Sequence, residues 1–209
     1  MILTLEKQDT LPQETTQERL GLIMREADKI RSIISHMRSL VTREGRVELS
    51  SVSLPGVVES VRCLMQQQLE AHGVELVVEI PELLPSVQAN DIQLEQVLVN
   101  LLSNAIHVMD GDSGKRDGPG NRGKCIRIRA YPLPETGRIR LEVADSGPGL
   151  PLGGERIFDP FFTTKERHEG MGLWLSIVHG LVSLWGGEIS AAQLHPELGG
   201  AVFYVDLLP

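Results

Sequence analysis

The chain has few cysteines, few aromatic residues, no excess of positive charge and no long apolar run, and each shortage excludes a class of protein. Two cysteines in 209 residues are too few for a disulfide framework or a zinc knuckle, and reduced thiols favour a cytoplasmic location. A formal net charge of -8 argues against a nucleic-acid-binding surface or a polybasic membrane surface. The absence of any run of 18 apolar residues predicts no membrane-spanning segment. An anionic ligand stays possible, because backbone N–H groups can hold phosphate on an acidic protein.

The N-terminal part, residues 1–46, differs in pattern from the rest of the chain. Apolar residues recur there at alternating spacings of three and four, which predicts a helix with a coiled-coil-like seam: Leu20, Ile23, Ala27, Ile30, Ile34, Met37 and Val41. Two interpretations are open, a helix packed on its own domain and a helix of an intermolecular bundle. Further apolar residues widen the stripe and favour the bundle. A turn and a short stub before this helix predict a partial helical hairpin whose first arm is cut short.

The remainder, residues 47–209, alternates between the two periodicities and predicts an α/β domain. Alternating residues predict strands over 47–53, 74–80, 126–133, 137–145, 187–194 and 200–208. Helical patterns cover 55–72, 91–109 and 173–185, the second capped by Asn90 or Asp91. Residues 81–90 and 110–123 are predicted to be connections, and 146–171 a long loop rich in glycine and proline.

A first group of polar residues lies on the predicted helix 91–109. Asn100 and Asn104 are four residues apart and His107 follows three later, so the three side chains share one face. Neutral oxygen ligands suit Mg²⁺, which keeps several waters and takes few protein ligands. The pattern predicts a site for phosphate and metal, although two asparagines on a solvated face explain it equally well.

A second motif, Asp145-Ser146-Gly147-Pro148-Gly149, directly follows a predicted strand. The Asp145 carboxylate can accept from an exocyclic amine while the glycine backbone runs close to a ring. Turns use the same residues, so the motif is weak when taken alone.

A third motif, Gly170-Met171-Gly172-Leu173, opens a helix whose free N–H groups can bind an anion. Before it, residues 157–165 contain three of the four phenylalanines of the chain and end at Lys165. Aromatic residues in a loop indicate that the loop docks on another surface, as a lid does.

The ordered set NLLSNA, DSGPG, IFDPFFTTK and GMGL resembles the N, G1, F and G2 boxes of bacterial sensor histidine kinases. The resemblance runs from about residue 17 to the end, and within the family it is similar to the nitrogen-regulation and C4-dicarboxylate sensor branches. It implies a two-layer α/β sandwich of the GyrB, Hsp90 and histidine kinase ATPase type, residues 47–209, preceded by a dimerisation hairpin, residues 1–46.

The resemblance also implies roles for individual residues, with ATP and Mg²⁺ as the ligands. Asp145 would accept from the adenine amine between Gly147 and Gly149, and Asn104 would bind Mg²⁺, with Asn100 nearby. Contacts to phosphate would come from His107, Lys165, Gly170, Met171, Gly172 and Leu173. GyrB-like ATPases carry a glutamate base where this chain has Asn100; an amide cannot take the proton, so phosphoryl transfer is favoured over hydrolysis.

The family's phosphoacceptor box, a histidine followed by an acidic residue and Pro-Leu, has no counterpart here. Only His36 lies in the hairpin, and no acidic residue follows it. We therefore expect a kinase core cut from its acceptor histidine and from an upstream sensor, and a membrane anchor in the parent protein is an open alternative. By resemblance it would form a homodimer through residues 20–41 and relay phosphate to a response-regulator receiver domain. The alternatives are a non-catalytic nucleotide-binding or dimerising module, and a serine kinase or ATPase of the same superfamily.

Overall fold

The computed structural model describes residues 48–111, 123–150, 154–160, 162, 172 and 174–209. The predicted hairpin, with its seam at residues 20–41, lies outside these residues. In chain order the elements are β1 (Ser50–Val52), α2 (Leu54–Ala71), β2 (Val74–Glu79), β3 (Val87–Ala89), α3 (Asp91–Gly111), β4 (Lys124–Leu133), β5 (Arg138–Asp145), the 3₁₀ helix η2 (Gly154–Phe158), α4 (Trp174–Leu184), β6 (Glu188–Ala192) and β7 (Val202–Leu207).

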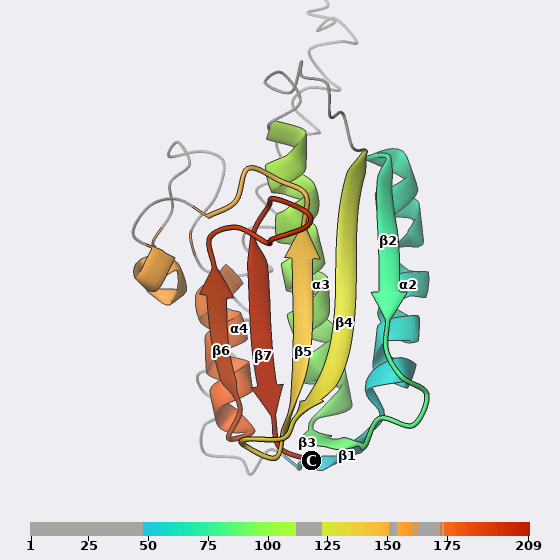
Figure 1. Cartoon of the computed structure of the whole chain (residues 1–209), viewed down its shortest axis with the longest axis vertical. Coiled ribbons are helices and arrows are strands. Elements are labelled where there is room, and N and C mark those ends of the chain that lie inside the picture. Colours follow the sequence, from blue (N-terminus) through green and yellow to red (C-terminus); the bar gives the residue numbers. More distant parts are fainter. Residues whose placement is uncertain (1–47, 112–122, 151–153, 161, 163–171, 173) are drawn as a thin grey trace, which may run out of the picture. The chain divides into compact units, whose positions relative to one another are not determined.

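A five-stranded sheet in the order β2-β4-β5-β7-β6 forms one layer, and helices α2, α3 and α4 form the other (Figure 1). Strands β2 and β4 are parallel, whereas the other neighbours are antiparallel. The hydrophobic core lies between the layers and includes the fully buried Leu98 of α3, Leu141 of β5 and Val178 of α4. This arrangement confirms the predicted α/β sandwich.

Alternation along the strands separates the two faces of the sheet. In β5, Ile139, Leu141 and Val143 are buried against the helices, while Arg138 and Arg140 point to the other face. Side chains of successive strand residues point to opposite faces, so a one-residue shift would bury the arginines. The apolar–polar alternation of 137–145 thus determines which face the helices cover.

The structure differs from prediction at the short strands. The strand expected at 47–53 is limited to β1, and the connection expected at 81–90 contains β3, which pairs antiparallel with β1. Val87 and Ala89 of β3 are fully buried, and Gln88 N–H donates to the Leu208 carbonyl at 2.8 Å. A three-residue strand carries too little periodicity to be recognised, and its stability comes from long-range packing.

The helix ends agree closely with prediction and explain how α3 is placed. Asn90 Oδ1 accepts from the Gln93 N–H at 3.1 Å, so of the two alternatives Asn90 is the N-cap and Asp91 is the first residue of the helix. The Trp185 indole, just beyond α4, donates to Gln93 Oε1 at 2.9 Å. The end of α4 therefore lies beside the start of α3. The two helices run in opposite directions, and the end of α3, the start of α4 and the end of β5 lie at the upper edge of the sheet (Figure 1).

Candidate functional site

Asp145 is the last residue of β5 and its carboxylate is held in one orientation. The residue is 5% exposed, and Oδ1 accepts from the Gly147 N–H at 2.7 Å and from the Ala201 N–H at 3.2 Å. The Asp145 N–H in turn donates to the Ala201 carbonyl at 2.9 Å. A carboxylate has about four acceptor positions, so two backbone donors on one oxygen orient the group and leave it able to accept from a ligand.

Glycines allow the backbone to approach this carboxylate closely. A Cβ on Gly147 would lie 2.7 Å from Asp145 Oδ1, and a Cβ on Gly200 would overlap both Asp145 Oδ1 and the Asp145 carbonyl. Gly149 has φ +83°, and a Cβ there would lie 2.6 Å from the Gln193 carbonyl oxygen. The turn after β5 therefore packs against the segment between β6 and β7, and side chains larger than hydrogen would push the two apart.

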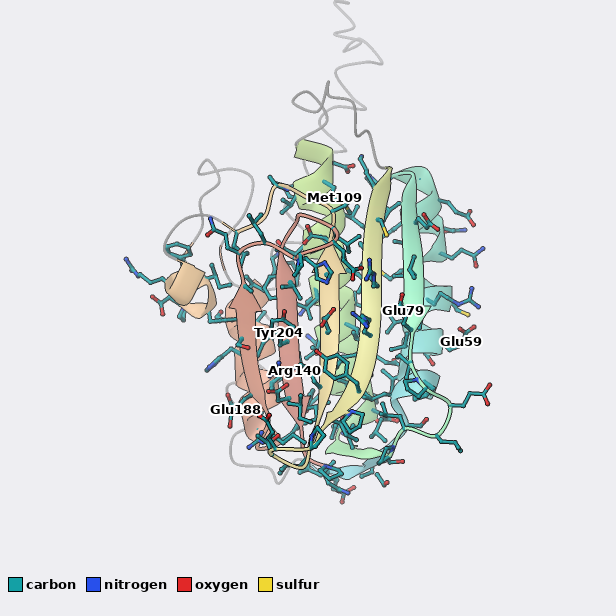
Figure 2. The ribbon with its side chains drawn as sticks, viewed as in Figure 1. Glu59, Glu79, Met109, Arg140, Glu188 and Tyr204 are labelled. Carbon is teal, nitrogen blue, oxygen red and sulfur yellow. The ribbon has the colours of Figure 1, made fainter. Side chains whose placement is uncertain are left out.

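Helix α3 forms the neighbouring wall. The Ser146 hydroxyl lies 3.4 Å from Met109 Sδ, which joins the turn after β5 to the last part of α3; Met109 is labelled in Figure 2. Along α3, Asn100 is 8% exposed, Asn104 is half-buried and His107 is exposed. The three residues share a stripe with Gln93, which contacts Trp185, so this stripe faces the side of α4.

Asn100 is notable because its Nδ2 is buried with no hydrogen-bond partner among the described residues. An unsatisfied buried amide costs free energy, and such a group is commonly satisfied by a ligand or an ion-bound water. The part of the chain that the structure describes has no group of three histidine, cysteine or acidic side chains suited to a metal. A metal here would be bound by amide oxygens together with ligand phosphates, which is the donor set that Mg²⁺ accepts.

The remaining predicted site residues divide into described and undescribed positions. Gly172 is half-buried with φ +62°, a backbone conformation that favours glycine just before α4. Lys165, Gly170, Met171 and Leu173 lie outside the described residues. Trp174, the first residue of α4, is 44% exposed and so does not fill buried space.

The phenylalanine-containing segment docks on α4, as expected of a loop that carries aromatic residues. Ile157 of η2 is buried in the core, and the Phe158 ring lies 5.8 Å from the His179 imidazole of α4. The guanidinium of Arg156 lies 5.5 Å from the Phe162 ring. This packing attaches the described part of the segment to α4.

Sequence reasoning missed Gly200 and Ala201, which lie just before β7 and support Asp145. The pair Gly199-Gly200 before the last strand was the available signal, because two glycines beside a strand often mark a close backbone approach. Ser146 was also missed; its hydroxyl accepts from the Cys125 N–H at 2.9 Å. Burial raises the pKa of the Cys125 thiol, which disfavours the reactive thiolate.

Comparison with known proteins shows the family. Residues 89–209 match the model of the histidine kinase-, DNA gyrase B- and HSP90-like ATPases. The chain belongs to this family. It is 33% identical to the two-component sensor PprA of Pseudomonas aeruginosa over 91% of this chain and 20% of that protein. It is 29% identical to the C4-dicarboxylate transport sensor DctB of the same species, over 95% of this chain and 31% of that protein. It thus spans between a fifth and a third of the length of these two relatives.

Solved structures agree with the family. The catalytic domain of the histidine kinase ThkA has a TM-score of 0.62 at 28% identity, covering 78% of this chain and 96% of that one. ThkA solved with the response regulator TrrA has a TM-score of 0.68 at 25% identity, covering 97% and 52%. ShkA with AMPPNP shares the fold, with a TM-score of 0.69 at 24% identity, covering 100% and 40%. Among the described residues, no helix has both the length and the apolar character needed to cross a bilayer.

Proposed function

We propose that the chain is the ATP-binding and phosphoryl-transfer core of a sensor histidine kinase. The observation that supports this most directly is the Asp145 carboxylate, buried at the end of β5 and oriented by two backbone N–H groups. A buried, oriented carboxylate beside a glycine turn is suited to accept from the exocyclic amine of adenine. Relatives of this chain include proteins named as sensor histidine kinases, and ShkA was solved with AMPPNP, an ATP analogue.

The residues of α3 would serve the phosphate end of the nucleotide. The unpartnered Nδ2 of Asn100 is a donor that a phosphate oxygen or a bound water would satisfy. Asn104 and Asn100 fit the ligand preference of Mg²⁺, which when bound would neutralise phosphate charge. Gly172, Met171 and Gly170 precede α4, whose N-terminal N–H groups favour an anion. These residues position the phosphates, and positioning with charge neutralisation is most of what phosphoryl transfer requires.

Asn100 also favours transfer over hydrolysis. A carboxylate at this position of α3 could remove a proton from an attacking water, whereas the Asn100 amide cannot. A bound nucleotide would then persist until another acceptor reaches it. We propose a histidine as this acceptor and a response-regulator aspartate as the next one, by analogy with ThkA, which was solved with a response regulator.

Substitution of Asp145→Asn tests nucleotide binding. It keeps the shape but replaces one carboxylate oxygen by a donor, so we expect ADP affinity measured by calorimetry to fall by roughly ten- to a hundredfold, the loss of a charge-assisted hydrogen bond. Asp206→Asn is the matched control, because Asp206 lies on the other face of the sheet, where it pairs with Arg140 at 2.7 Å. Equal ADP affinity in the Asp145→Asn variant and the unmodified chain would contradict the adenine assignment.

Incubation of the chain alone with γ-labelled ATP tests the acceptor. We expect nucleotide binding without acid-labile label, because His36 has no neighbouring carboxylate in the sequence to activate it. Label on His36 would show that the hairpin contains the acceptor after all.

We further propose a cytoplasmic homodimer formed by the seam at residues 20–41. Ile30→Glu would place a charge on the seam, which is costly unless the charge is paired. Light scattering should show a dimer for the unmodified chain and dissociation for this variant. A monomer in both cases would indicate that the seam packs within one chain.

A further inference from the structure

A buried histidine outside the site already described connects two structural elements. His195 is 5% exposed and lies in the segment between β6 and β7. Its Nε2 lies 3.4 Å from Oε1 of Glu142, a buried residue of β5. This carboxylate oxygen has no hydrogen-bond partner among the described residues, so the approach of Nε2 is a contact and not a hydrogen bond, whereas Oε2 of Glu142 accepts from the Tyr131 hydroxyl at 3.1 Å.

The other side of the imidazole holds its own segment together. His195 Nδ1 accepts from the backbone N–H groups of Glu197 at 3.2 Å and Leu198 at 3.1 Å. Because backbone N–H groups only donate, Nδ1 carries a lone pair and the ring proton is on Nε2, facing Glu142. The His195 N–H donates to the Gly200 carbonyl at 2.6 Å, and the Gly199 N–H to the His195 carbonyl at 2.8 Å. Within this tight loop the imidazole thus serves as the hydrogen-bond acceptor for the Glu197 and Leu198 N–H groups, a role that a backbone carbonyl often has in turns.

This loop, residues 193–200, contacts the turn after β5, residues 146–150, which we propose binds the nucleotide. The Leu150 N–H donates to the Gln193 carbonyl at 3.1 Å, and Gly149 packs against Gln193 and Leu194. At its other end the loop leads into Ala201, whose N–H donates to Asp145 Oδ1. One end of the loop is thus bonded to Leu150, and the residue after its other end is bonded to Asp145, the last residue of β5.

We propose that His195 is a positioning residue for this turn, acting from the face of the sheet opposite the proposed nucleotide site. Glu142 is on the face that carries Arg140 and Tyr204, labelled in Figure 2, whereas Asp145 is on the face covered by α3. Through Nε2 the imidazole attaches the loop to β5, and through Nδ1 it keeps the loop in the shape that presents the Ala201 N–H and the Gln193 carbonyl. The proposal rests on nucleotide binding at Asp145.

Two conservative variants separate the two sides of the imidazole. In His195→Asn the amide oxygen takes the place of Nδ1 and accepts from the Glu197 and Leu198 N–H groups, but the contact with Glu142 is lost. In His195→Gln the amide nitrogen reaches towards Glu142, but the acceptor for the loop is lost. His195→Ala lacks both groups. Tyr131→Phe is the matched control, because it removes the hydroxyl that donates to Glu142 and leaves the loop unchanged.

The measurements are ADP affinity by calorimetry, and amide hydrogen exchange of Leu150 and Ala201 in the absence of nucleotide. We expect His195→Ala to weaken ADP binding by about tenfold and to speed exchange at both amides, because two backbone donors lose their acceptor. His195→Asn should recover affinity to within about threefold, while His195→Gln should not. Tyr131→Phe should lower the unfolding temperature and leave ADP affinity unchanged.

The outcomes distinguish the two proposals. If the unmodified chain binds no ADP, nucleotide binding fails, and the exchange rates of Leu150 and Ala201 still test the role of His195. If all three His195 variants bind ADP like the unmodified chain, His195 is structural only and the positioning role is overturned. Recovery by glutamine but not asparagine would overturn the role of Nδ1. If His195→Ala does not fold, the comparison of ADP affinity and amide exchange between His195→Asn and His195→Gln tests the positioning role.

Discussion

The two faces of the five-stranded sheet are built from the same strands, but one face is apolar and buried while the other is charged and partly exposed. The helix-covered face is apolar, with Leu141 and Val205 of neighbouring strands fully or almost fully buried. The other face, in the part of the chain that the structure describes, carries a series of ion pairs. Three join residues of different strands, Arg129 with Glu79, Arg138 with Glu188 and Arg140 with Asp206, and the fourth joins Arg127 of β4 to Glu197 of the loop between β6 and β7. Each of these four arginines is paired with a carboxylate, so the guanidinium groups on this face are neutralised where they meet water.

The comparison teaches how stability and chemistry are distributed. The apolar face contributes most of the free energy of folding, because burial of apolar area is the dominant favourable contribution. The charged face contributes less, since pairs that remain partly exposed are worth little. The proposed site lies at the end of β5, where a carboxylate occupies a position on the apolar face and must therefore be satisfied by backbone donors.

The largest expected effect comes from removing apolar volume on the covered face. Leu141 is fully buried, so Leu141→Ala should lower the free energy of unfolding by about 2–5 kcal/mol. Leu64→Ala on α2 is the matched control, since Leu64 is 68% exposed, and it should change stability by less than about 0.5 kcal/mol. Urea unfolding measures both; similar losses would contradict the assignment of the core to this face.

The second variant changes Gly200, which lies just before β7 and packs against Asp145 at the end of β5. A Cβ there would overlap Asp145 Oδ1, so Gly200→Ala should cost about 1–3 kcal/mol and strongly weaken ADP binding. Gly180→Ala on α4, where a Cβ meets nothing within 4 Å, should leave binding unchanged and stabilise by up to about 1 kcal/mol. Unchanged ADP affinity of Gly200→Ala would show that the loop after β6 does not control Asp145.

The charged face can be weakened without changing its net charge. Arg140 forms two hydrogen bonds to Asp206, both at 2.7 Å, and its guanidinium lies 4.8 Å from the Tyr204 ring. A lysine cannot reproduce this paired and stacked geometry, so Arg140→Lys should cost about 1–2 kcal/mol. Arg62→Lys, in an exposed pair with Glu59 on α2, should cost less than about 0.5 kcal/mol by thermal unfolding. Equal losses of stability in Arg140→Lys and Arg62→Lys would mean that the geometry of the Arg140–Asp206 pair does not contribute to stability.

The smallest effect concerns an ion-pair cluster away from the sheet face. Lys124 at 2.6 Å and His72 lower the pKa of Asp110, so the folded state favours the ionised carboxylate. The resulting stabilisation is present above about pH 4 and is lost as the pH falls through the lowered pKa. The stability gap between the unmodified chain and Asp110→Asn should therefore shrink in acid, by less than about 1 kcal/mol because the carboxylate is partly exposed. Urea midpoints from pH 2 to 6 measure this; a constant gap would contradict it.

Much of the fold was predictable because its patterns are local. The strong helical periods of α2, α3 and α4 and the alternation of β4 and β5 identified these elements within one or two residues. The short β3 and the 3₁₀ helix η2 were not identified, since three to five residues carry no resolvable period. For the site, Asp145, Asn100 and Asn104 were named from sequence motifs, whereas Gly200, Ala201 and His195 were not, because their role depends on contacts far along the chain.

The sequence by itself determined which strand faces are apolar, since a side-chain period of two leaves only one face for burial. It also determined that Asp145 ends a strand and that amides line one stripe of α3. Only the tertiary structure decided that β7 lies next to β5, and with it that the Ala201 N–H, more than fifty residues away, orients Asp145. Strand neighbours are selected by the combined packing of all layers. The free energy of this packing comes from contacts between segments that are far apart in the chain, and a local sequence pattern does not encode it. A motif can therefore indicate the chemistry of a residue without indicating the groups that hold it in place.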